Sequence, residues 1–169
     1  NEQVLIIETI NHIRRRLEYP VPFTLIVCYN TPCDLPEIEA ELAALDGRVD
    51  GPGENLLKVM RVHASTSKAG NLNAALQQVH TDLVVIYDAD HHPDPDSLRI
   101  MTTQLLRKNA HCVQGSTYIR QCDSLMALLI DAEFFVIFFL AFPAVEIATG
   151  MGWFGGSNAL WRTGGLRKK

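Results

Sequence analysis

Two aspartates, Asp88 and Asp90, follow an apolar run and are separated by a single alanine. Carboxylates are not buried in an apolar core without a partner, so we expect this pair to face a cleft at the end of a strand. Carboxylates at this spacing can share a divalent cation with phosphate oxygens, because Mg²⁺ and Mn²⁺ prefer oxygen ligands and keep positions for water or substrate. The pair predicts a metal and phosphate site; the alternative is two ordinary aspartates of a surface turn.

More polar residues follow in the same segment. His91 is a further candidate for contact with the metal or the diphosphate, although a histidine beside a carboxylate can also be only a hydrogen-bonded neighbour. His92 is expected to be structural or exposed. Asp94, followed by Pro95, is typical of a helix N-cap, and Asp96 of a favourable charge in the first helical turn.

A second candidate phosphate site lies in the loop at residues 65–73, which combines hydroxyls, glycine and Lys68 before a predicted helix. Free backbone N–H groups and the positive end of the helix dipole favour an anion there, and Lys68 adds a full positive charge. The alternative is an exposed loop with ordinary capping. The sequence has neither a P-loop nor a G-x-G-x-x-G dinucleotide fingerprint.

Residues 154–162 place two glycines and small polar residues between aromatic side chains. Such a segment lets the backbone approach a ligand closely, while the aromatic faces suit a sugar. A tight turn between core aromatics is the alternative.

Helices and strands alternate along the chain, and this order predicts how these residues are positioned. Apolar spacing and breakers predict helices at residues 2–17, 36–45 and 70–79, a helix beginning near Asp94, and strands at 23–28, 56–62, 83–87 and 112–114. This order predicts an α/β fold, a mainly parallel sheet with helices on both faces. Ligands of such sheets bind at the carboxyl ends of the strands, so residues 29–31, 63–68, 88–96 and 114–117 should lie along one edge.

Composition limits the possible function classes. The chain has 169 residues, 47% of them hydrophobic, and a formal net charge of -4, which fits one folded domain and argues against nucleic acid as a partner. The basic runs at residues 14–16 and 167–169 are expected to be solvated. The cysteines, at positions 28, 33, 112 and 122, lack zinc-site spacing and are expected to be reduced, mostly buried thiols.

The most apolar stretch runs from Leu125 to Val145 and is interrupted by Asp131, Glu133 and Pro143. Because a spanning helix needs about 20 apolar residues, we expect a buried or membrane-surface helix here and no clear transmembrane helix.

Taken in order, the motifs resemble those of glycosyltransferase family 2, in particular its processive cellulose-synthase-like and hyaluronan-synthase-like members. The matching segments are S-K-A-G-N-L-N at 67–73, D-A-D-H at 88–91 followed by Pro93, V-Q-G at 113–115 and F-G-G-S-N at 154–158. The opening Asn1-Glu2 is similar to the end of that family's first motif. Four motifs in order are far more specific than any one of them.

The resemblance implies a GT-A fold and inverting transfer from a nucleotide-diphosphate sugar, most often a UDP-sugar, to a glycan acceptor. It implies Mn²⁺ or Mg²⁺ held by Asp90, with Asp88 on the nucleotide or its metal-bound phosphates. The expected donor-side contacts are Glu2, Asn30, Lys68, Asn71, Asp88 and Asp90. The expected acceptor-side contacts are Gln114, Phe154, Gly156, Ser157 and Asn158.

The chain departs from the family pattern in two respects. Where many relatives have an Asp-Asp pair after the second strand, this chain has Cys28 to Pro32, which leaves the base of the nucleotide open. The family's catalytic base lies in a later E-D motif, and a Q-x-x-R-W motif follows later still, so we expect the base beyond Lys169. Asp131 and Glu133 lie in an apolar helix and are not expected to replace it.

These departures favour part of a catalytic domain of a larger enzyme. Its nucleotide-sugar part is expected at about residues 1–120 and its acceptor-side part at about 121–169. The resemblance implies that the full-length protein is embedded in a membrane, with this domain on the cytoplasmic face.

Two other functions stay open. A phosphohydrolase of the haloacid-dehalogenase type also places D-x-D after an apolar strand and would use Asp88 as its nucleophile. Its usual Thr or Val two residues after the second aspartate is His92 here, and the K-A-G-N and F-G-G-S-N segments would have no role. The other alternative is a non-catalytic module that binds nucleotide-sugars or glycans.

Overall fold

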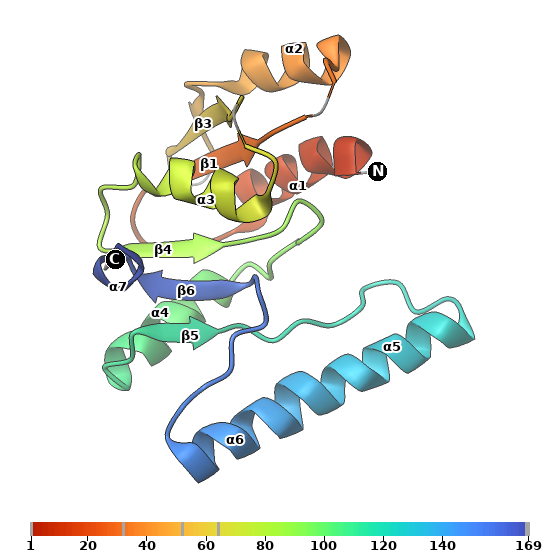
Figure 1. Ribbon diagram of the computed structural model, residues 1–169, viewed down its shortest axis with the longest axis vertical. Helices are drawn as coiled ribbons and strands as arrows, with labels where there is room; N and C mark the ends of the chain where they lie inside the picture. The colour runs from red at the N-terminus through yellow and green to blue at the C-terminus, as the bar shows by residue number, and fades with distance from the viewer. Residues whose placement is uncertain (1, 32, 52, 64, 168–169) are drawn as a thin grey trace. The chain divides into compact units, whose positions relative to one another are not determined.

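The computed structural model describes residues 2–31, 33–51, 53–63 and 65–167, with side chains from Leu5 onward. The chain forms two compact units (Figure 1). Unit 1 comprises Asn1–Asp82 and Ala89–Arg99, and unit 2 comprises Leu83–Asp88 and Ile100–Lys169.

Unit 1 is built on a mixed three-stranded sheet in the order β1-β3-β2, in which β1 and β3 are parallel and β2 is antiparallel to β3. Its elements are α1 (Glu2–Arg16), β1 (Thr24–Tyr29), α2 (Pro36–Leu45), β2 (Val49–Asp50), β3 (Asn55–Arg61) and α3 (Lys68–Leu76). The predicted helices and strands of this part are confirmed, and their ends agree or differ by up to three residues. The short strand β2 was not predicted.

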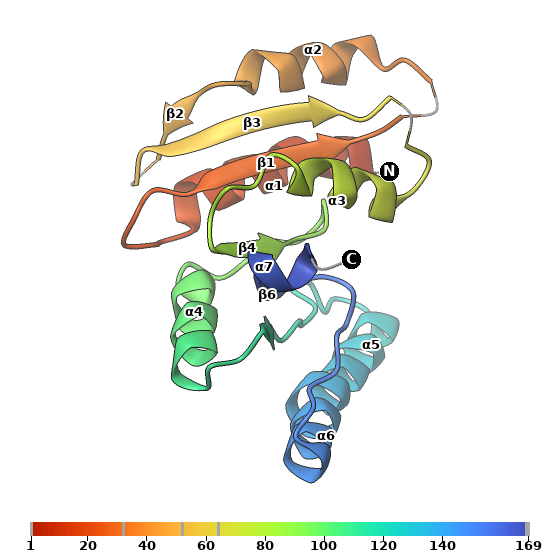
Figure 2. The same ribbon diagram turned by 60° about the vertical axis from the view of Figure 1, so that its left-hand side comes forward.

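The core of unit 1 joins α1 and α2 to the sheet through four buried side chains, Ile10, Val27, Leu42 and Leu57. Successive residues of a strand point to opposite faces, so Cys28 points away from this core. Its thiol donates to the backbone carbonyl of Asn71 in α3 (Sγ to O, 3.1 Å). Helices therefore cover both faces of this sheet, as predicted, and Figure 2 shows α1 and α3 on either side of β1.

Unit 2 contains a second three-stranded sheet in the order β4-β6-β5, in which β6 is antiparallel to both neighbours. Its elements are β4 (Leu83–Ile86), β5 (Cys112–Gln114), α5 (Leu125–Phe135), the π-helix η1 (Val136–Ala141), α6 (Phe142–Thr149), β6 (Ala159–Arg162) and α7 (Thr163–Leu166). Helix α4 (Ser97–Arg107) passes from unit 1 into unit 2. Ile86 at the end of β4 and Gln114 at the end of β5 both pair with Ala159.

The prediction of one mainly parallel sheet was wrong, because the described strands form one mixed and one antiparallel sheet. The difference arises from β6, which lies within residues 154–162 and was not predicted as a strand. By pairing with both β4 and β5, β6 makes that sheet antiparallel while the carboxyl ends of β4 and β5 still lie at the same edge.

Two local expectations were also wrong. Asp94 is not the N-cap of α4, because the helix begins at Ser97, whose N–H donates to the Asp94 carbonyl in a turn before it (3.0 Å). Arg14 is not solvated: it is buried and pairs with Asp50 of β2, since the helical phase turns it toward the sheet. Arg15 and Arg16 are exposed, as predicted.

The apolar stretch forms one continuous helix over Leu125–Thr149, through α5, η1 and α6. Proline lacks an N–H and its ring crowds the preceding turn, which normally kinks or breaks a helix, but this helix continues through Pro143. The chain instead widens into π turns, in which the Phe142 N–H donates to the carbonyl of Ile137, five residues back. By length and composition alone this helix could cross a membrane, so the expectation of no clear transmembrane helix was wrong. Its most apolar window is not buried, so of the two expected arrangements, a buried or a membrane-surface helix, the buried one was also wrong.

Candidate functional site

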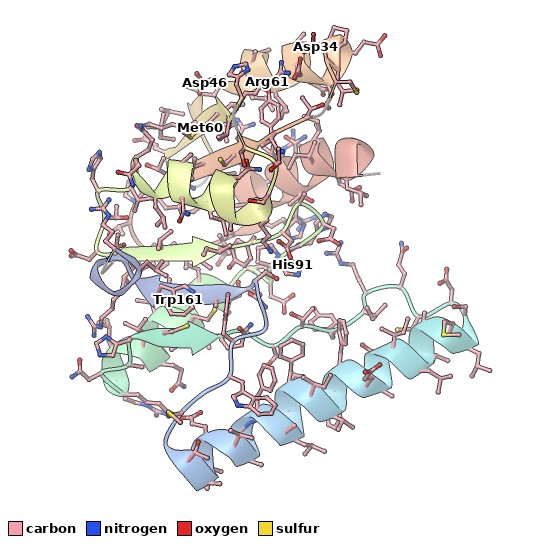
Figure 3. All side chains as sticks on the ribbon, viewed as in Figure 1. Asp34, Asp46, Met60, Arg61, His91 and Trp161 are labelled. Atoms are coloured by element: carbon pink, nitrogen blue, oxygen red, sulfur yellow. The ribbon has the colours of Figure 1, made fainter. Side chains whose placement is uncertain are left out.

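The aspartate pair lies where β4 ends, as predicted. Asp88 is half-buried two residues after the strand, Asp90 is exposed, and His91 is half-buried. His91 is labelled in Figure 3 in the loop that follows β4. The exposed carboxylate of Asp90 is accessible to a ligand from solvent.

Helix α1 holds the loop Ala89–Pro93 within unit 1. The buried hydroxyl of Thr9 donates to the Ala89 carbonyl (2.6 Å), and Nε2 of His12 lies 2.9 Å from the Pro93 carbonyl oxygen. The rings of His12 and His92 stack, with centroids 4.6 Å apart. Sequence reasoning missed both anchors, although a threonine and a histidine near the apolar stripe of Ile6, Ile10 and Ile13 were a usable signal.

Replacing Thr9 by valine is expected to lower the free energy of unfolding by about 1–3 kcal/mol, because the Ala89 carbonyl loses its donor while the site stays buried. Thermal or urea unfolding measures this effect. Thr163→Val is a matched control, because Thr163 is equally buried and its hydroxyl is without a hydrogen-bond partner among the described residues. Equal losses in the two variants would contradict the anchoring role of Thr9.

The loop before α3 leads into a helix N-terminus that is exposed and capped by the chain. Ser67 is the N-cap and accepts from the Gly70 N–H (3.1 Å), and the Ser65 hydroxyl donates to the Ser67 carbonyl (2.9 Å). Lys68 is the first helical residue and is exposed. The helix dipole and the Lys68 charge together favour an anion at this end, and binding of a diphosphate there stays a prediction.

Gly70 is required by this loop, because a Cβ there would lie 2.5 Å from Oγ of Ser65. Gly70→Ala is therefore expected to displace the Ser65 hydroxyl and cost about 1–3 kcal/mol of stability. Gly165→Ala is the control, since a Cβ at Gly165 of α7 meets no described atom within 4 Å and alanine favours a helix. Thermal unfolding of both variants tests the prediction, which fails if Gly70→Ala is as stable as Gly165→Ala.

The carboxyl end of β1 is joined to the α3 loop by paired amides. Asn30 donates through Nδ2 to the Ser65 carbonyl (2.9 Å) and accepts from Nδ2 of Asn71 (2.7 Å). The structure thus brings Asn30 and Asn71 together, and Oδ1 of Asn71 is buried without a hydrogen-bond partner among the described residues. Glu2 begins α1, but its side chain lies outside the described residues.

In unit 2, Gln114 brings together the predicted acceptor-side residues. Its Nε2 lies within 3.1 Å of the carbonyl oxygens of Gly115, Ser157 and Asn158, and its Oε1 accepts from the Gly155 N–H (2.9 Å). The Gln114 amide is therefore occupied by the chain itself, and its observed role is to position the turn at residues 155–158.

Asn158 ties the same turn to both neighbouring strands. Its N–H donates to the Ile86 carbonyl and its carbonyl accepts from the Gly115 N–H, both at 2.7 Å. Its φ is 51°, a left-handed conformation that asparagine adopts more readily than most residues. Phe154, half of whose side chain is exposed, packs edge to face on Trp161 of β6, which Figure 3 labels (centroids 5.2 Å apart).

The metal-ligating residue types do not cluster in the described part of the chain. In the part of the chain that is described, no three His, Cys, Asp or Glu side chains gather as they do in a site made by protein alone. Two carboxylates nevertheless suit Mg²⁺ or Mn²⁺, which take phosphate and water as further ligands. Cys28 and Cys112 are not expected to compete as metal ligands. Burial raises the pKa of Cys112 to about 11 and also raises the pKa of Cys28, so both thiols are protonated at neutral pH.

The chain was compared with known proteins. No curated protein matches it. The model of the family described as "Glycosyltransferase like family 2" matches residues 1–168, nearly the whole length. That family implies a GT-A fold and, in general, transfer of a sugar from a nucleotide-sugar donor to an acceptor. Because the match extends over the site residues of both units, the chain belongs to glycosyltransferase family 2.

Proposed function

We propose that this chain binds a nucleotide-diphosphate sugar, a UDP-sugar in the first instance, through Mn²⁺ or Mg²⁺ held by Asp88 and Asp90. The observation that carries this proposal is the anchored loop Ala89–Pro93, which Thr9 and His12 fix to α1. An exposed carboxylate on a fixed loop is preorganised for a cation, whereas a mobile one would lose entropy on binding. His91 is a further candidate ligand beside the pair.

The proposed reaction is inverting transfer of the sugar to a growing glycan. The metal would supply Lewis-acid stabilisation of the charge that develops on the leaving diphosphate. Lys68, exposed at the N-terminus of α3, adds a positive charge where the helix dipole already favours phosphate. Asn30 and Asn71 are proposed to contact the nucleotide with their remaining donors and acceptors, and Glu2 is retained as a donor-side candidate.

On the acceptor side, we assign the sugar contacts to the turn that Gln114 and Asn158 hold. Phe154, Gly156 and Ser157 are its candidate contact residues, because aromatic rings such as the partly exposed Phe154 suit a sugar and Gly156 has no side chain to block one. Gln114 and Asn158 are proposed to act mainly by positioning these residues.

None of the donor-side, acceptor-side or metal-binding candidates is proposed as the general base. Asp131 is a carboxylate that could be mistaken for the base. It accepts a hydrogen bond from the Ile119 N–H (2.7 Å) and so has a structural role in unit 2. A membrane location, with this domain on the cytoplasmic face, remains a proposal that comes from the family resemblance.

The test is release of nucleotide diphosphate by the full-length protein from a panel of nucleotide-sugars, with Mn²⁺ or with a chelator. Metal-dependent release together with sugar incorporation into glycan supports the proposal. Release of inorganic phosphate from phosphomonoesters, with an Asp88 adduct trapped by beryllium fluoride, would instead establish the hydrolase. Metal-dependent donor binding without turnover would leave a binding module.

A further inference from the structure

The carboxyl ends of β4 and β5 hold Asn158 between them in unit 2. Its backbone N–H donates to the Ile86 carbonyl, its carbonyl accepts from the Gly115 N–H, and its φ of 51° is left-handed. Figure 1 shows β6, which begins at the next residue, between β4 and β5. Residues other than glycine in this conformation are uncommon and gather at functional sites, which indicates a use for the Asn158 side chain.

The contacts of the Asn158 amide determine its orientation. Nδ2 donates to the Ser116 carbonyl (2.9 Å), a group that only accepts, and lies 3.4 Å from the Thr117 hydroxyl oxygen. The nitrogen therefore faces Ser116 and Thr117. Among the described residues no group donates to Oδ1 of Asn158, and this oxygen is not enclosed, unlike Oδ1 of Asn71. The side chain thus presents an accessible acceptor that the described chain does not use.

The Thr117 hydroxyl complements this acceptor. Its oxygen accepts from Nδ2 of Asn158, which leaves its own proton to donate. Thr117 is half-buried, so its position is more restricted than that of the exposed Ser116. The hydroxyl donor and the amide acceptor are separated only by the amide nitrogen. Vicinal hydroxyls of a sugar suit such a pair, because one of them can donate to the amide oxygen while its neighbour accepts from the threonine.

Gly115 provides the space that the amide occupies. A Cβ at this position would lie 2.8 Å from both Nδ2 and Oδ1 of Asn158, which is closer than the packing of real side chains allows. The glycine of the V-Q-G segment and the asparagine of the F-G-G-S-N segment therefore fit each other at the edge of the sheet, although they lie far apart in the chain.

The chain around this amide is uncharged. Residues 113–119 and 150–161 include no Asp, Glu, Lys, Arg or His. In the same part of unit 2, Phe154 packs edge to face on Trp161. Recognition of phosphate or carboxylate relies on cationic side chains, and these two segments contribute none. Neutral donors and acceptors beside aromatic rings favour sugar hydroxyls as the ligand instead.

We propose that Oδ1 of Asn158 and the hydroxyl of Thr117 form a subsite for vicinal hydroxyls of a sugar. The subsite lies at the end of β4, because Asn158 bonds to Ile86, two residues before Asp88. The inference rests on the proposed function, since it takes the ligand of unit 2 to be a sugar, and it adds Thr117 as a specificity-determining contact. The sugar belongs either to the donor or to the acceptor, and kinetics separate these two sources.

Free sugars test the subsite without transferase activity. The ¹⁵N-labelled chain is titrated with glucose, galactose, mannose or N-acetylglucosamine, and NMR follows the Nδ2 protons of Asn158. At least one sugar is expected to shift these signals saturably. Thr117→Val should raise the Kd of that sugar about tenfold, whereas Thr117→Ser keeps the hydroxyl and should stay within about threefold of the wild type. Thr24→Val is the matched control, because Thr24 is exposed at the start of β1, and its Kd should equal that of the wild type.

Monodeoxy forms of the same sugar separate a direct contact from positioning of Asn158. Removal of the contacted hydroxyl should weaken binding to the wild type about tenfold and hardly change binding to Thr117→Val, which has already lost the contact. Equal losses in both proteins for every monodeoxy form would show that Thr117 only positions Asn158, and would overturn the proposal.

The source of the sugar is identified with the full-length protein. Thr117→Val should raise the KM for the nucleotide-sugar if the donor sugar occupies the subsite, and the KM for the acceptor if the acceptor sugar does. Unchanged values of both would overturn the proposal. If UDP binds with Mn²⁺ but no sugar shifts the Asn158 signals, this inference is wrong and the proposed function stands. If neither UDP nor any sugar binds, both are wrong.

Discussion

Replacing Asp90 by alanine is expected to lower the rate of sugar transfer by the full-length protein about a thousandfold or more. The exposed carboxylate is the proposed ligand of the cation that stabilises the leaving diphosphate, and removal of such electrostatic stabilisation has effects of about this size. The rate of nucleotide diphosphate release at saturating donor and Mn²⁺ measures the loss.

Asp82→Ala is the matched control for this experiment, because Asp82 is an exposed aspartate in the turn before β4. Its rate should equal that of the wild type. If Asp90→Ala retains wild-type turnover in a folded protein, the metal assignment is wrong. If Asp82→Ala loses as much activity as Asp90→Ala, the effect reflects general damage near β4 rather than loss of a ligand.

Gln114→Glu is expected to be the most destabilising of the substitutions considered for unit 2, with a loss of about 3 kcal/mol. The amide nitrogen of Gln114 lies within 3.1 Å of three carbonyl oxygens, so a carboxylate oxygen in its place would face three acceptors without a proton to donate. The turn at residues 155–158 should lose its order together with the stability. Urea unfolding at neutral pH measures the loss.

The pH dependence adds a second readout. Repulsion by the carbonyls raises the pKa of the new glutamate in the folded state, so its protonated form is favoured there. The destabilisation is therefore complete above that raised pKa and shrinks as the pH falls toward the ordinary value of about 4.3.

Gln104→Glu provides the same chemical change in a favourable place, because Oε1 of Gln104 already accepts from Arg107 in α4 (2.9 Å). That variant should be as stable as the wild type or slightly more stable. Equal destabilisation of the two variants, or none in Gln114→Glu, would contradict the clamping role of Gln114.

Local patterns predicted most of the individual elements. Helix α2 is signalled by Pro36 at its start, and strand β1 by its own β-branched residues. Both elements occur where expected. The pairing of β6 with β4 and β5 depends on residues far apart in the chain, which periodicity does not report. For the same reason the antiparallel sheet was missed although β4 and β5 themselves were found.

The candidate site shows the same division between local and distant information. The loop residues Asp88, Asp90 and Lys68 were found from their types and spacing, because phosphate and metal chemistry needs charges at element ends. Thr9 and His12 were missed because their partners lie about eighty residues away. Gln114 was found as a motif residue, but only its contacts show that it holds the turn rather than standing free.

The central claim, that the chain binds a nucleotide diphosphate through a cation at Asp88 and Asp90, is tested most directly by calorimetric titration of the chain with UDP. With Mn²⁺ present, wild-type protein should bind one UDP per chain, and binding should disappear with a chelator and in Asp90→Ala. UDP binding that is equally strong with Mn²⁺, with the chelator and in Asp90→Ala would contradict the claim.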